Sequence, residues 1–387
     1  MNRASVAPAS QHVEHAVISL RLWGSDTLHD LSASPSAPLL IGRSGACAIR
    51  LLGRHTAPLH AQLTFDADQW RIQDLGTAYG VRQDGVPRSG FVLTPGVEIG
   101  IGGSTLVAES TFTRRLRAFC QRLLGWDIDR MRAVDHALRA IRFAGARRTP
   151  LVLCGEGDLV PIAYALHRLM IGHAAPFVVC DPRRNQTRAS VRSPPNTPLG
   201  IQALSHAMGG TLCVRHARLP ADFDEACRRA YDPDSDVQII VCARDLQQVA
   251  LVDGTLAIEV PALGLREREL SRIVQEYAED AISTFGVDRA HFNADDRDWV
   301  MTHCARSLAE IEKATLRVIA LSASHSGSHA AARLGMAPVS LARWLDRRPQ
   351  RATDAKPAEL TPLVRDAQFT GNPMADPNHE PRHAPRS

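Results

Sequence analysis

The sequence has 387 residues, of which 44% are hydrophobic and 22% charged, and its mean hydropathy is −0.15. These values predict two or three domains with hydrophobic cores, and they exclude a chain that is disordered throughout or collagen-like. The longest apolar runs are far shorter than the roughly 20 residues that a membrane-spanning helix needs, and the N-terminus lacks the apolar core of a signal peptide. We therefore expect a cytoplasmic protein with no membrane partner.

The eight cysteines and the formal net charge of +4 narrow the functional classes further. The cysteines are scattered without a CxxC pair, which predicts buried free thiols and no metal site. Residues 305–348 contain seven basic and three acidic residues, so this segment carries the whole net charge. It is the part of the chain expected to meet a polyanion. The first lysine is Lys313, so chemistry that needs a lysine is not expected before it.

Hydrophobic periodicity divides the chain into consecutive parts. Residues 1–14 are expected to be disordered. Residues 15–110 contain short alternating apolar stretches between Gly, Pro and Asp-Gly turns, which predict an all-β sandwich. Residues 111–148 show helical periodicity and form a predicted connector. Residues 149–265 contain five compact apolar runs separated by helical segments, which predict a parallel α/β sheet.

The C-terminal part is predicted to be all-α. Residues 266–304 form one helical region and residues 305–348 a second, whereas residues 349–387 have too few apolar groups to order. The second region opens with Ser307 and Glu310 spaced as a capping box. The helix that follows has an apolar stripe that could pack against a second copy, and we expect a homodimer. The stripe consists of Leu308, Ile311, Thr315, Val318 and Ile319.

Four blocks in residues 15–110 resemble the forkhead-associated (FHA) domain. They are LLIGRSGACAIRL, HTAPLHAQL, WRIQDLGTAYGVRQDG and GVEIGIGGSTLVAE, in the family's order. In that family an arginine and a serine hold a phosphothreonine, a histidine braces the serine's loop, and an asparagine before a glycine holds the peptide backbone. The resemblance implies a β-sandwich whose partner is a phosphothreonine protein.

Some of the family's polar groups are present and others are replaced. Arg43 and His60 match the arginine and the histidine. The serine position holds Ala57, and the asparagine position holds Tyr79. Thr56 would reach the phosphate if the loop shifted by one residue. The candidate phosphopeptide-binding residues are Arg43, Thr56, His60, Tyr79 and Gly80. Because a phosphate dianion needs several charge-assisted donors, we expect weakened or altered binding. The alternative is that the glycines only set turns and His60 bonds locally.

Four later blocks are similar to the AAA+ domain of sigma-54-dependent (NtrC-like) activators. They are PLVLCGEGDLVPIAYALHRLMIGHAAPFVVCD, MGGTLCVRHARLP, SDVQIIVCARDL and VPALGLREREL. The family's phosphate loop needs a second glycine and a lysine. These fall on Val160 and Pro161, or the lysine falls on Leu159 in the alternative alignment. The resemblance therefore implies the fold of an ATPase without its phosphate loop.

The other catalytic positions of that family are also replaced. The aspartate and the glutamate of the acidic block become Arg215 and His216. Glu156 and Asp158 place negative charge in a loop that is left without a cation, and no GAFTGA string, the family's contact with the sigma factor, occurs. We expect no catalytic residue, no cofactor and no enzymatic activity. The degenerate AAA+-like core would serve as a scaffold or interaction surface.

The segment from Ser307 to Arg348 resembles the Fis-type helix-turn-helix that ends NtrC-like activators. Gly335 stands at the turn and Pro338 in the first turn of the second helix, which would enter the major groove of double-stranded DNA. Arg343 would contact guanine, and the other arginines would contact phosphates. The candidate DNA-binding residues are Arg333, Val339, Ser340, Arg343, Arg347 and Arg348. The alternative is a three-helix packing module.

Together these observations predict a DNA-binding transcription regulator with an FHA input module and an inactive AAA+-like core. The alternative function is a phosphoprotein-binding signalling adaptor that dimerises through its C-terminal helices.

Overall fold

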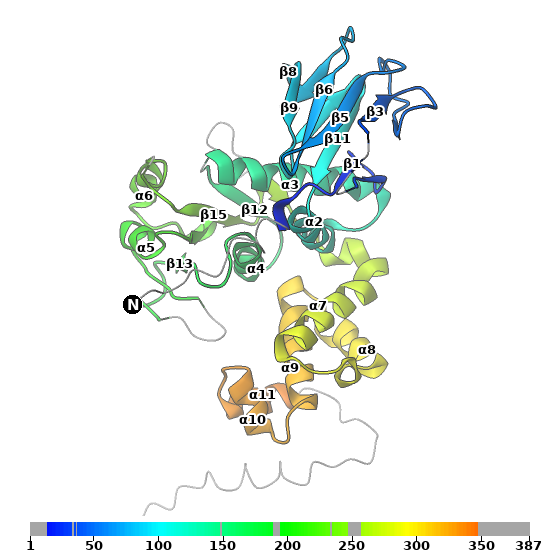
Figure 1. Ribbon diagram of the computed structural model, residues 1–387. Coiled ribbons are helices and arrows are strands. Elements are labelled where there is room, and N and C mark those ends of the chain that lie inside the picture. The colour runs from blue at the N-terminus through cyan, green and yellow to red at the C-terminus, as the bar shows by residue number, and fades with distance from the viewer. Residues whose placement is uncertain are drawn as a thin grey trace, which may run out of the picture.

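The computed structural model describes residues 14–32, 35, 37–147, 149–188, 194–232, 234–246 and 257–346. Within them an N-terminal β-sandwich, a parallel sheet with helices and a C-terminal helical region follow one another (Figure 1). The multidomain fold predicted from the sequence is confirmed at this level. The expected disorder of residues 349–387 and of most of residues 1–14, and the candidate residues Arg347 and Arg348, fall outside the described residues.

The sandwich consists of two sheets, with strand orders β2-β1-β11-β10-β7-β8 and β4-β3-β5-β6-β9. All neighbours are antiparallel except β3 and β4. Every second residue of the longer strands points into one shared core, where Leu20, Ile41 and Ile99 are fully covered. The strands are β1 (Ser19–Leu22), β2 (Leu28–Asp30), β3 (Leu39–Gly42), β4 (Ile49–Arg50), β5 (Ala61–Asp66), β6 (Gln69–Asp74), β7 (Val81–Gln83), β8 (Val86–Arg88), β9 (Gly90–Val92), β10 (Glu98–Ile101) and β11 (Ser104–Glu109).

Two helices connect the sandwich to the parallel sheet. Helix α2 (Thr111–Leu124) begins at a capping box in which the Ser110 side chain accepts from the backbone N–H of Thr113. It ends at Gly125, whose φ of 125° favours glycine, and a short 3-10 turn, η1 (Ile128–Arg130), leads into α3 (Met131–Arg147). The apolar stripes of both helices are buried, so this connector belongs to the core of the molecule.

The five apolar runs form a sheet of five parallel strands in the order β13-β14-β15-β12-β16. Strands β12 to β15 are buried on both faces, which explains why their runs lack alternation, whereas the edge strand β16 is partly exposed. Helix α4 (Val160–Met170) covers one face, and α5 (Gly200–His206) and α6 (Phe223–Ala230) cover the other. The strands are β12 (Leu151–Cys154), β13 (Phe177–Cys180), β14 (Thr211–Arg215), β15 (Gln238–Ala243) and β16 (Ala257–Glu259), and η2 (His216–Arg218) follows β14.

The C-terminal region consists of helices packed on one another and on the connector. Its last two helices form a small core with α9 around Ala330, Ala331, Leu334 and Leu341. The elements are η4 (Leu263–Glu269), α7 (Leu270–Phe285), η5 (Arg289–His291), α8 (Ala294–His303), α9 (Leu308–Ser322), α10 (Gly327–Arg333) and α11 (Pro338–Leu345).

Helix α9 differs from the expectation in two ways. Its apolar stripe is buried in this chain against α7, so the stripe is not available to a second copy. Periodicity shows that a face is buried but not what covers it. Ser307 does cap the helix by accepting from the N–H of Glu310, but the Glu310 carboxylate binds Arg306 at 2.9 Å and does not complete a capping box.

The structure contains no sign of a membrane span, a disulfide or a metal site within the residues it describes. No helix there is both long enough and apolar enough to cross a bilayer. All eight cysteines are free, and seven are buried, as the sequence predicts. No group of three or more metal-ligating side chains gathers among the described residues.

Buried ion pairs join the sandwich to the connector. The side chain of Arg21, on β1, is 1% exposed, and its Nε donates to Glu109 at 2.6 Å. Its two Nη groups donate to the two carboxylate oxygens of Asp135 on α3. One turn along α3, Arg139 binds Glu98 of β10 with its Nε at 2.7 Å from Oε1. We call Arg21, Glu109 and Asp135 the Arg21 clamp.

Removing the guanidinium would leave two buried carboxylates of the clamp without their partner. Arg21→Ala should therefore lower the free energy of unfolding by about 3–5 kcal/mol, measured by urea denaturation. The control is Arg115→Ala, because Arg115 forms a solvent-exposed pair with Glu14 and should contribute less than about 1 kcal/mol. Equal losses in the two variants would contradict the role of the clamp.

Candidate functional site

Three loops of the sandwich carry the predicted phosphopeptide-binding residues, and hydrogen bonds hold these loops together. The loop after β3 is tied to the loop after β4 by two bonds, from the N–H of Arg43 to the carbonyl of Ala57 and from the N–H of Ser44 to the carbonyl of Pro58. His60 links the second loop to the loop between β6 and β7. These residues, far apart in the sequence, therefore meet in one place.

His60 is fully buried and acts as the brace between two loops. Its Nδ1 accepts from the backbone N–H of Ala57 at 3.1 Å, so the ring proton must lie on Nε2. Nε2 can then donate to the carbonyl of Gly80 at 2.9 Å, and it lies 3.1 Å from Oγ1 of Thr77. The ring thus fixes the position of Ala57, where the FHA family has its serine.

Arg43 is exposed on these loops and forms no ion pair with a described residue. The Nε of Arg50 donates to the carbonyl of Arg43 at 3.3 Å, which places a second exposed guanidinium beside the first. Arg54, in the loop after β4, is also exposed. Sequence reasoning missed Arg50 and Arg54, although their spacing after Arg43 in a loop-rich stretch was a usable signal. The three arginines give this end of the sandwich a positive surface.

The remaining predicted residues differ in accessibility. Thr56 is buried and its hydroxyl has no hydrogen-bond partner among the described residues, so a ligand could reach it only if the loop moved. Tyr79 is 52% exposed and its ring lies 4.3 Å from that of His55. Gly80 has a φ of 60°, the left-handed conformation that its turn requires. Where the FHA family has its asparagine, this chain therefore presents an exposed aromatic side chain.

At the carboxyl edge of the parallel sheet, the structure corrects one expectation. Asp158, in the loop after β12, is paired with Arg215 at the end of β14 at 3.1 Å. Arg215 also lies 3.4 Å from Asp181, which follows β13. The loop is thus not left without a cation. Arg215 therefore neutralises the acid of this loop.

The space beside the loop after β12 is small. The cavity between this loop and the segments that begin at Val260 and Arg306 has a volume of about 20 Å³. That is room for about one water molecule.

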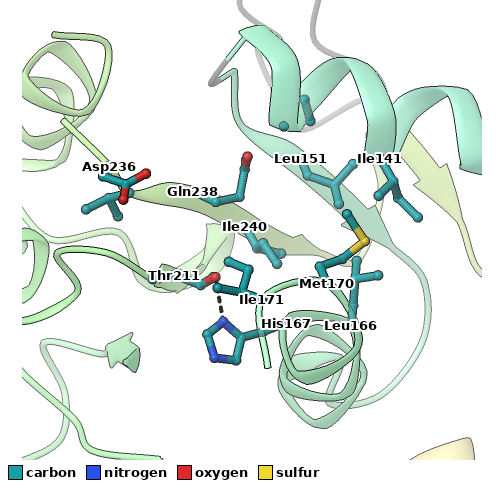
Figure 2. A pocket seen from close by; sticks show the side chains of 14 residues that line it. Ile141, Leu151, Leu166, His167, Met170, Ile171, Thr211, Asp236, Gln238 and Ile240 are labelled. Carbon is teal, nitrogen blue, oxygen red and sulfur yellow. Dashed lines mark hydrogen bonds between the residues drawn. The ribbon is translucent and has the colours of Figure 1, made fainter. Parts of the chain in front are cut away.

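A larger pocket of about 200 Å³ lies at the opposite, amino-terminal edge of the sheet (Figure 2). Side chains from α3, α4, β14 and β15 line it, and most of them are apolar. His167 accepts from the Thr211 hydroxyl through Nδ1 at 2.8 Å, and its Nε2 lies 3.2 Å from the carbonyl of Ala175. Burial lowers the pKa of His167, so the ring is neutral near pH 7. It binds its neighbours and offers no free polar group to a ligand.

Three of the predicted DNA-binding residues lie on the outward face of helix α11. Val339 is 60% exposed, and Ser340 and Arg343 are also exposed. Arg333 is placed differently from the expected phosphate contact. Its Nη groups donate to the carbonyls of Ala323 and Phe285, each at 3.0 Å. Arg333 therefore fixes α10 to the end of α7.

Comparison with known proteins identifies the sandwich. The FHA domain family matches residues 39–102, which confirms an FHA domain in this part of the chain. Similar solved structures include an FHA domain from "Structural and functional analysis of phosphothreonine-dependent FHA domain interactions", with 23% identity, a TM-score of 0.22, and coverage of 24% of this chain and 93% of that one. Another is the FHA domain of CT664 from Chlamydia trachomatis, with 18% identity, a TM-score of 0.22, and coverage of 24% and 95%.

A third similar structure is Mycobacterium tuberculosis EmbR in complex with a low-affinity phosphopeptide. It shares 25% identity, has a TM-score of 0.23, and is matched over 24% of each chain. No curated protein matches this chain. The resemblances to an AAA+ core and to a Fis-type module stay predictions.

Proposed function

We propose that this chain is a signalling regulator in which the FHA domain binds a phosphothreonine segment of a partner protein and the C-terminal helices bind DNA. The observation that carries the first part is the free guanidinium of Arg43 on loops braced by His60. Arginine binds phosphate oxygens in a fork, and the rigid loops lower the entropy cost of binding. Arg50, beside Arg43, supplies a second charge in place of the missing serine hydroxyl.

We expect Arg43→Ala to lower affinity for phosphothreonine peptides at least tenfold, measured on a peptide array and confirmed by fluorescence anisotropy with the full chain. The loss follows from removing a charge-assisted bidentate contact. Arg71→Ala is the control, because Arg71 lies on β6 away from these loops. Equal binding of unphosphorylated threonine peptides, or unchanged binding by Arg43→Ala, would contradict this part of the proposal.

The DNA-binding part is supported by α11, whose outward face combines Val339, Ser340 and Arg343. Small and apolar side chains can approach base edges, and Arg343 can contact guanine in the major groove. The two helices before α11 bury its apolar side, so the exposed face is the one left for a partner. Arg347 and Arg348 would extend the positive charge beyond the described helix.

Arg343→Ala should weaken binding of the full chain to mixed genomic DNA fragments by about tenfold and reduce the slope of affinity against salt concentration. Arg306→Ala is the matched control, because Arg306 pairs with Glu310 at the start of α9.

Deleting everything after residue 304 would be a poor test, since it would remove α9 from the core it shares with α7. Phosphopeptide binding without any DNA binding would favour the adaptor instead. A dimer of that adaptor would need a surface other than the buried stripe of α9.

We also propose that the AAA+-like core is an inactive scaffold. Pro161 has no backbone N–H to donate to a phosphate, and the loop before it is bonded to Arg215. The small cavity beside that loop supports the same reading.

The full chain with ATP and Mg²⁺ should release no more inorganic phosphate than a protein-free blank, because the loop has no lysine and Arg215 and His216 stand at the expected positions of the metal-binding aspartate and the glutamate. The measurement is a phosphate-release assay. A rate above the blank that Arg215→Ala abolished would overturn the proposal, because it would place hydrolysis at this edge of the sheet.

A further inference from the structure

An exposed pair of rings lies on the phosphopeptide loops of the sandwich. The ring of Tyr79, in the loop between β6 and β7, lies 4.3 Å from the ring of His55, in the loop between β4 and β5, with 33° between their planes. Both side chains are exposed. We call Tyr79 and His55 the aromatic pair. Rings of this kind are typical of binding surfaces, because they bury a large area on contact and lose little conformational entropy.

His55 is held in an unusual backbone conformation. Its φ is 64°, in the left-handed region that residues other than glycine rarely adopt. The turn between β10 and β11 packs against this loop. The N–H of Gly103 donates to the carbonyl of Arg54 at 2.6 Å, and a Cβ at Gly102 would lie only 2.7 Å from the carbonyl carbon of His55. Because strained residues that their surroundings hold in place are concentrated at functional sites, the fixed ring of His55 is a candidate for ligand contact.

The His60 brace fixes the other member of the pair. The carbonyl of Gly80, the residue after Tyr79, lies 2.9 Å from Nε2 of His60 and accepts its proton. Two further apolar side chains are exposed on these loops, Leu59 just before His60 and Leu75, whose N–H donates to the carbonyl of His60 at 3.1 Å. The loops thus combine an aromatic pair with exposed leucines beside the positive surface.

The charges on these loops decide which side chain the aromatic pair suits. Arg43, Arg50 and Arg54 are exposed, and Arg54 directly precedes His55. Residues 31–65 and 75–80 contain no aspartate or glutamate. Aromatic faces attract cations, but the three arginines would repel a lysine or arginine of a partner. The aromatic pair therefore suits an uncharged apolar or aromatic side chain.

We propose that the aromatic pair selects an uncharged apolar or aromatic side chain within a few positions of the phosphothreonine in the partner protein. The FHA family has at the position of Tyr79 an asparagine that holds the peptide backbone, and a tyrosine ring cannot supply the hydrogen bonds of that amide. Apolar contact with the pair takes their place, so binding depends on the sequence around the phosphothreonine. This inference rests on the proposed phosphothreonine binding and specifies the class of segment that the site takes.

The test is fluorescence anisotropy of the full chain with labelled phosphothreonine peptides. Each position near the phosphothreonine is occupied in turn by alanine, leucine, phenylalanine, aspartate or arginine. The wild-type chain should bind the best leucine or phenylalanine peptide about fivefold more tightly than the alanine peptide, because the contact buries apolar area. Tyr79→Ala should bring this ratio to about one, and Tyr79→Phe, which keeps the ring, should retain it.

A second variant removes the other ring without straining the loop. His55→Gly should also lower the ratio, because glycine adopts a φ of 64° without cost and has no side chain to contact the ligand. The matched control is Tyr231→Ala. Tyr231 is an exposed tyrosine at the end of α6, outside the FHA domain, and its loss should leave the ratio unchanged.

The possible results distinguish this inference from the proposed function. The inference alone is overturned when phosphopeptides bind in a way that depends on Arg43 but show no preference for an apolar residue, or prefer aspartate or arginine. It is also overturned when the preference survives in both Tyr79→Ala and His55→Gly. Failure of every phosphothreonine peptide to bind would overturn this inference together with the phosphothreonine part of the proposed function.

Discussion

The position of the FHA domain relative to the rest of the molecule depends on the Arg21 clamp. A buried guanidinium costs much free energy unless every carboxylate around it is correctly placed, so the clamp tolerates one docking geometry of the sandwich on α3. Strand β10 shows the consequence. It begins at Glu98, which binds Arg139 of α3, and it ends at the turn where Gly102 touches the backbone of the loop around His55. The phosphopeptide loops thus lie at the end of the sandwich opposite to the connector, where a partner protein can approach them (Figure 1).

At the carboxyl edge of the parallel sheet, two charges that would each be unfavourable alone form an ion pair. Asp158 alone is an acid in the loop after β12, and Arg215 alone is a cation at the end of β14. Placed 3.1 Å apart, they neutralise each other and join the ends of two strands. The edge is therefore held by an ion-pair network, in which Arg184 and Arg218 also bind Asp181.

Periodicity predicted the elements well because burial on one or both faces leaves a direct mark on the order of apolar residues. The five apolar runs are the five strands, and the helical stripes of the connector are buried. What each side chain contacts could not be predicted in the same way. The apolar stripe of α9 predicts a buried face, but it does not show that α7 covers that face. Likewise, the residues before His60 do not show that the Thr56 side chain points inward. The pairing of Arg21 with Asp135 joins residues more than a hundred positions apart, and nothing local marks it.

A count of charges by segment has the same weakness, because it does not show which charged side chains are paired within the fold. The whole net charge lies between residues 305 and 348, but the structure uses much of it internally. Arg306 is paired with Glu310, the Arg317 guanidinium lies over the Trp344 ring, and Arg333 binds two carbonyls. On the described part of α11, Arg343 is the arginine left facing outward. Arg43, Arg50 and Arg54 lie outside that segment, yet all three are exposed on neighbouring loops of the sandwich. Because an anion responds to the local field and not to a segment's sum, a charge count by segment does not find such a surface.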